Sequence, residues 1–154
     1  MLFRSFLLGD DGAMILPGLR RIRLWQDSVE AAGWNPGAIE RCRLGIDKFS
    51  QSVESGYVDA PLRPRALFNL QRQAASAGDI NIQRLRGRKA TELVSRQVYR
   101  SRALEAFVGK TETFLRSARV AAAIPQHFQL NRPFRYTDLD STVDMIIDTV
   151  RGAR

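Results

Sequence analysis

Cysteine and histidine are almost absent from this sequence, in which Cys42 and His127 are the single examples of each. One cysteine excludes a disulfide within the chain, and the two residues are too few for a conventional zinc site. No apolar run approaches the roughly 18 residues that a membrane span needs. We therefore expect a protein without a transmembrane span, soluble or peripheral to a membrane, in a reducing compartment.

Catalytic motifs are also missing. The sequence has no Walker loop, no dinucleotide-binding fingerprint, and no HExxH or CxxC pattern. His127 lies between two prolines, where a lone histidine is more often a packing or surface residue than a catalyst. Asp140, Asp144 and Asp148 recur at four-residue steps, which is more typical of an acidic helix face than of a metal site. The sequence therefore predicts no enzyme, no catalytic residue, no cofactor and no bound metal.

Positive charge is in excess, with 24 Lys and Arg against 16 Asp and Glu. Arginine supplies nearly all of it, and its planar guanidinium suits fixed contacts with carboxylate or phosphate better than lysine does. A GC-rich genome can produce the same bias. The densest stretch, residues 83–102, predicts a basic face that binds a partner. Its members are Arg84, Arg86, Arg88, Lys89, Arg96, Tyr99, Arg100 and Arg102.

Apolar residues at three- and four-residue steps favour helices along most of the chain. We expect an all-α fold, a small bundle of four to five helices with an extended N-terminal arm. The helices are expected at residues 19–32, 36–55, 64–76, from 80 or 91 to 123, and from 137 or 138 to 150. This pattern divides the chain into an arm (1–18), a basic helical core (19–124), a proline-bracketed irregular linker (125–136) and a C-terminal amphipathic helix (137–154).

The C-terminal helix carries an apolar seam at the spacing of a coiled coil. About four helical turns are too few to be stable alone in water, so this seam must dock on something. It docks either on the long basic helix, with its aspartates near Arg96, Arg100 or Arg116, or on a partner subunit. The docking residues are Leu139, Val143, Ile146 and Val150.

The N-terminal arm combines apolar residues with one arginine, Arg4, in the manner of a mitochondrial presequence. Asp10 and Asp11 depart from that pattern, because transit peptides are poor in acids. The alternative is an apolar arm that packs on this protein or on a neighbour. We expect a mitochondrial location, and otherwise a cytoplasmic one.

Residues 96–107, RQVYRSRALEAF, resemble the opening helix of LYR-motif proteins, with Val98-Tyr99-Arg100 in the place of the Leu-Tyr-Arg triplet. A second alignment puts Leu24-Trp25-Gln26 there, and GIDKF at residues 45–49 then matches a downstream phenylalanine of the family. The resemblance implies a small basic three-helix fold in mitochondria. Members are accessory subunits or assembly factors of respiratory complexes and often bind an acyl carrier protein, whose acidic helix Arg96 and Arg100 would face.

Two functions agree with these features. The first is a non-catalytic, basic accessory subunit of a large assembly, such as the mitochondrial respiratory chain or ATP synthase, that acts by docking on other subunits. The alternative is an RNA-binding structural protein, such as a subunit of the mitochondrial ribosome, because concentrated Arg and Lys are also the electrostatic signature of phosphate binding.

Overall fold

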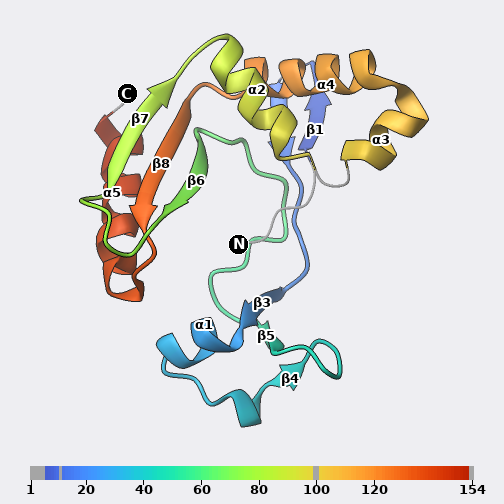
Figure 1. The fold of residues 1–154 in the computed structure, drawn as a ribbon. Helices are drawn as coiled ribbons and strands as arrows, with labels where there is room; N and C mark the ends of the chain where they lie inside the picture. The colour runs from blue at the N-terminus through green and yellow to red at the C-terminus, as the bar shows by residue number, and fades with distance from the viewer. Residues whose placement is uncertain (1–5, 11, 99–100, 153–154) are drawn as a thin grey trace. The chain divides into compact units, whose positions relative to one another are not determined.

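The structure is a computed structural model that describes residues 6–10, 12–98 and 101–152. These residues form five α-helices and eight strands in three sheets, so the fold is α/β (Figure 1). The prediction of an all-α bundle is therefore wrong. The chain divides into two compact units: unit 1 holds Ile15–Leu62, and unit 2 holds Phe6–Met14 together with the chain from Arg63 onward.

Unit 1 is a small three-stranded antiparallel sheet with one short helix. Its sheet has the order β3-β5-β4, and Val29 and Phe49 form its buried core. Half-buried Ile22 and Leu24 alternate along β3 with exposed residues, which is the period of a strand rather than of a helix. The elements are β3 (Arg21–Trp25), α1 (Gln26–Ala31), a 3-10 turn (Pro36–Ala38), β4 (Glu40–Arg41) and β5 (Lys48–Ser52).

The helix expected at residues 36–55 does not form. Gly45 has a φ of 76°, in the left-handed region that an α-helix does not contain, and it lies in the loop between β4 and β5. Phe49, which fits a helical stripe in the sequence, lies in β5 and is buried. Cys42, from the same stripe, is exposed, so the helical spacing of these residues does not correspond to one buried face.

Unit 2 is built on a second three-stranded sheet, in which the last strand of the sequence lies in the middle. β8 (His127–Pro133) is parallel to β6 (Leu67–Gln73) and antiparallel to β7 (Asn81–Leu85). The helix predicted at 64–76 is thus wrong, since β6 occupies most of that segment. The irregular backbone predicted between the prolines is wrong too, because β8 lies there.

The prolines around β8 explain that error. Pro125 precedes the strand and Pro133 is its last residue, so neither removes a backbone donor from the strand interior. Between them, Phe128 and Leu130 are buried, and Phe128 stacks on Phe68 of β6 with 4.8 Å between ring centroids. The flanking prolines therefore bound a central strand instead of an irregular segment.

Three helices take the place of the single long helix expected up to residue 123. They are α2 (Arg88–Arg96), α3 (Ser101–Val108) and α4 (Lys110–Ala123). Gly109, with a φ of 84°, separates α3 from α4. α4 packs on both α2 and α3, and its buried Thr113, Ser117 and Ala121 lie one turn apart on one face. Small side chains at this spacing allow two helices to approach closely.

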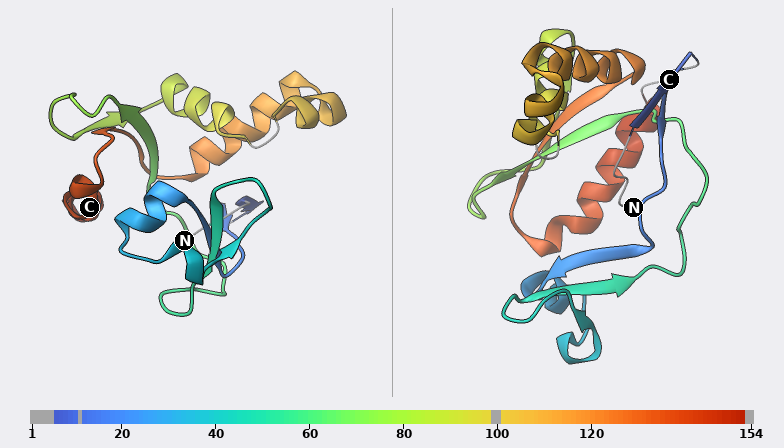
Figure 2. Two further views of the ribbon diagram at one scale, coloured as in Figure 1. Left: turned by 60° about the horizontal axis from the view of Figure 1, so that its bottom comes forward. Right: turned by 90° about the vertical axis from the view of Figure 1, so that its right-hand side faces the viewer.

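A two-stranded sheet and a C-terminal helix complete unit 2. β1 (Phe6–Gly9) pairs with β2 (Gly12–Ile15) in a two-stranded sheet, and β1 also contacts α4. α5 (Leu139–Gly152) follows a 3-10 turn (Tyr136–Asp138) and occupies the segment where the C-terminal helix was expected. Both views in Figure 2 place α5 beside the sheet of β6, β7 and β8 and apart from α2–α4.

Within the described ranges, no helix combines the length and the apolar character that crossing a bilayer requires.

Candidate binding surfaces

Four of the predicted basic residues gather where β7 passes into α2. Arg84 lies in β7, Arg86 follows the strand, and Arg88 and Lys89 open α2; we call these four residues the basic junction. All four side chains are exposed. Arg88 forms an ion pair with Glu92 one turn later, at 3.3 Å, whereas Arg84, Arg86 and Lys89 have no ion pair with any described residue. The junction therefore presents uncompensated positive charge.

The first turn of α2 adds to that charge. Gly87 is the N-cap residue of the helix and provides no side-chain hydrogen bond to the first turn. Backbone N–H groups at a helix N-terminus carry partial positive charge and attract anions. A cavity of about 300 Å³ lies beside this turn and is lined by Arg84, Arg86 and three alanines of α4, among other residues. Basic side chains, a helix N-terminus and a hollow thus share one place.

His127 lines the same cavity but has a structural role. Its ring is buried, and its Nε2 lies 2.8 Å from the backbone oxygen of Ala121. Because a carbonyl oxygen only accepts, Nε2 is the protonated nitrogen in this contact. The hydrogen bond joins the start of β8 to the end of α4, in agreement with the packing role that the sequence favoured.

The remaining basic residues do not continue the junction along one helix. Arg96 ends α2 and Arg102 belongs to α3. The basic face predicted at residues 83–102 is therefore divided between different elements. Tyr99 and Arg100, which carry the LYR-like triplet, lie outside the described residues. In the second alignment, Leu24 and Trp25 lie in β3 and Gln26 begins α1.

α5 presents part of its predicted docking seam to solvent. Leu139 and Val143 are exposed, whereas Ile146 and Val150 are half-buried and Thr142 is fully buried. Among the described residues, the aspartates of α5 form no ion pair with Arg96, and Arg116 pairs instead with Glu112 on its own helix. The proposed docking of α5 on a basic helix of the same chain therefore has no support in these contacts.

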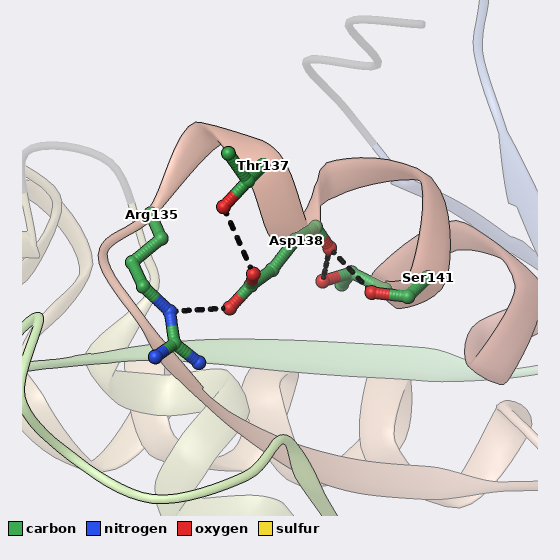
Figure 3. Close-up of polar contacts among 5 residues, drawn as sticks. Arg135, Thr137, Asp138 and Ser141 are labelled. Carbon is green, nitrogen blue, oxygen red and sulfur yellow. Dashed lines mark hydrogen bonds and ion pairs between the residues drawn. The ribbon is translucent and has the colours of Figure 1, made fainter.

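Polar contacts hold the start of α5 (Figure 3). Arg135 Nε donates to Asp138 Oδ2 at 2.7 Å, and the Thr137 hydroxyl donates to Oδ1 of the same carboxylate at 3.1 Å. Ser141 and Thr142 both donate their hydroxyl protons to the backbone oxygen of Asp138. The hydrogen bond from Arg135, offset in part by desolvation, lowers the pKa of Asp138 below its ordinary value of 3.8.

Sequence reasoning missed a set of exposed apolar residues in unit 2. They lie on β1, α3 and α4. α4 contacts both β1 and α3. Phe107 is 88% exposed and Leu7 55% exposed. The set comprises Phe6, Leu7, Leu8, Phe107, Phe114 and Leu115. Part of the signal was present in the FLLG run of the N-terminal arm, for which the sequence left open a targeting segment or an apolar arm that packs on this protein or on a neighbour.

The described residues contain no group of three or more His, Cys, Asp or Glu side chains that could hold a metal ion. No protein-family model, curated protein or solved structure matches this chain. The surfaces themselves therefore carry the functional argument.

Proposed function

We propose that this protein is a non-catalytic subunit of a larger protein assembly and docks through the exposed apolar set of unit 2. The exposure of these residues is the observation that carries the proposal. Single exposed apolar side chains are ordinary on a protein surface, but several large ones on adjoining elements are typical of an interaction site. Phe107 is the extreme case, because burying a phenylalanine ring stabilises a complex by roughly 1.5–3 kcal/mol.

The charges on the same helices indicate the chemistry of the partner. α4 carries Lys110, Arg116 and Arg119 against Glu112, whereas α3 carries one base, Arg102, and one acid, Glu105. Glu112 forms an ion pair of 2.8 Å with Arg116, whose hydrogen bond lowers the pKa of Glu112, so α4 keeps a net positive charge. A partner with an apolar centre and an acidic rim would match both features, because complementary charges favour the correct encounter and exclude wrong partners.

An acidic helical protein, such as a mitochondrial acyl carrier protein, matches the positive charge of α4 and remains part of the proposal as a contact of that helix, separate from any contact at β1. A mitochondrial location is also part of the proposal. Cell fractionation followed by immunodetection tests the location, and addition of the purified carrier protein tests the partner. Recovery of the chain only from the cytosolic fraction would remove both from the proposal and leave the docking surface untouched.

The docking proposal is tested by the native mass of the protein in extracts of the cells that make it. Phe107→Ser should release the chain from its assembly, since the ring would lose its apolar contacts. Leu44→Ser is the matched control, because Leu44 is 92% exposed in unit 1 and outside the apolar set. Recovery of the unaltered protein solely as a free monomer would contradict the proposal.

Binding to structured RNA is the second candidate, and the basic junction favours it. Three of its four basic side chains have no ion pair with a described residue, and they surround a helix N-terminus. A mobility-shift assay across a salt series would detect phosphate binding, whose log–log slope falls by about 0.7–0.9 for each phosphate neutralised. Replacing Arg84 and Arg86 with Gln should flatten that slope, whereas Arg43→Gln in unit 1 should leave it unchanged.

A further inference from the structure

The sheet of β1 and β2 differs from the other two sheets because neither of its edge strands contains a charge or a proline. Exposed edges normally carry charges, prolines or bulges that prevent another strand from pairing with them. β3 contains two arginines, β4 and β7 one each, and β6 contains Arg72. β1 reads FLLG and β2 reads GAMI, and neither contains a charge. A further strand can therefore be added to this sheet more easily than to the other two, and β1 offers it the larger apolar side chains.

β1 is also apolar on both of its faces. Successive residues of a strand point to opposite sides, so Phe6 and Leu8 share one face and Leu7 occupies the other. All three are exposed. A strand with one solvated face alternates apolar and polar residues, whereas a continuous apolar run is typical of a strand inside a sheet that is covered on both sides. The composition of β1 therefore suits the interior of a larger sheet.

The present sheet is too small to provide that environment. Among the described residues, β1 pairs with β2 alone, and a two-stranded sheet is marginally stable in water without further strands or packing. We propose that a β-strand of a partner protein pairs with β1, so that the β1–β2 hairpin becomes part of a larger sheet. This inference rests on the proposed docking function and specifies its mode, in which main-chain hydrogen bonds give affinity and apolar side chains give specificity.

The charges beside β1 indicate a different protein rather than a second copy of this chain. α4 contacts β1 and carries Lys110, Arg116 and Arg119 against one acid, Glu112. Pairing two copies through β1 would bring two such basic helices toward each other, and the whole chain has a formal charge of +8. The strand that fits is apolar on both faces and flanked by acidic side chains.

A charge placed on β1 should block strand addition in the same way that natural edges do. The full chain and its Leu7→Lys variant are compared for recovery of the native complex by mass and for affinity to the isolated partner. We expect Leu7→Lys to weaken the complex about tenfold or more. Leu70→Lys is the matched control, since Leu70 is 61% exposed in the edge strand β6. It should leave affinity within about twofold.

The melting temperature of each isolated variant establishes that the fold is retained, and a photo-crosslinking phenylalanine analogue at position 6 locates the contact. A crosslinked partner peptide that is apolar and flanked by acids, together with loss of binding in Leu7→Lys, supports strand addition. Unchanged binding of Leu7→Lys beside weakened binding of Phe107→Ser would overturn strand addition and leave the docking function standing. A complex with the mass of two copies would overturn the choice of partner, and a monomer throughout would overturn both proposals.

Discussion

β8 (HFQLNRP) and β1 (FLLG) are strands of unit 2 whose surroundings differ: β8 is enclosed by the fold and β1 is not. β8 has a strand on each side, and its Leu130 is 0% exposed. Among the described residues, β1 has one neighbouring strand, β2, and its Leu7 is 55% exposed. The more polar sequence thus forms the buried core strand, and the more apolar one forms the exposed edge. The number of neighbouring strands, rather than the hydrophobicity of the strand, decides what each leucine contributes to stability.

The largest expected difference comes from one identical substitution in the two strands. Leu130→Ala should destabilise the isolated chain by about 2–5 kcal/mol, because it removes buried contacts and leaves a cavity in the centre of the sheet. Leu7→Ala should change the free energy of unfolding by less than about 1 kcal/mol, since its side chain is already largely in water. Urea denaturation of the two variants measures both values.

Equal losses of stability in the two variants would contradict the distinction between the strands. A large loss for Leu7→Ala alone would mean that β1 belongs to the core of the isolated protein. The slopes of the two urea transitions serve as the control, because an unchanged slope shows that the variants unfold the same surface.

A smaller effect should appear between β8 and its neighbour β6. The rings of Phe68 and Phe128 stack across these strands at an interplanar angle of 20°. Replacing each with Leu, separately and together, should give a coupling energy of about 0.5–1.5 kcal/mol beyond the loss of buried area. Strictly additive single effects would show that the two rings do not interact, and that the pairing of β6 with β8 rests on other contacts.

The smallest expected change in stability concerns Asp138, in the segment that connects β8 to α5. The pKa of Asp138 is lowered in the folded protein, chiefly by its hydrogen bond from Arg135, so its carboxylate contributes stability above its ordinary pKa of 3.8. That contribution is lost as the pH falls through the lowered value, over roughly pH 5 to pH 2. The unaltered protein should therefore lose slightly more stability across this range than Asp138→Asn. Parallel loss in both proteins would show that the contact does not stabilise α5.

Helices and strands of this chain differ in how well the sequence predicts them. The segment of α5 and much of α2 and α4 show helical spacing, because those elements are amphipathic and pack on one side. β5 and β6 were missed because their apolar residues, such as Phe49 and Leu67, also fall at helical spacing, and β8 was missed because Pro125 and Pro133 bracket it. Which spacing applies depends on strand pairing between distant segments, and a local window does not contain that information.

The candidate surfaces were predictable to the extent that they are local. Arg84, Arg86, Arg88 and Lys89 lie within six positions of one another, so their gathering at one junction follows from the sequence alone. The exposed apolar set joins β1 to α3 and α4, about 100 residues later in the chain, and only the fold shows that contact. Its apolar strand was visible as FLLG, but its exposure was not.

Hydrogen exchange at the backbone amides of β1 and β8 tests the central claim most directly. In the isolated chain, Leu130 should be protected up to the global stability, and Leu7 and Leu8 should exchange much faster, because their strand has one neighbour. In the native assembly, protection of the β1 amides should rise while that of Leu130 stays constant. Rapid exchange of β1 in the assembly, or full protection of β1 in the isolated chain, would contradict the claim that a partner strand completes this sheet.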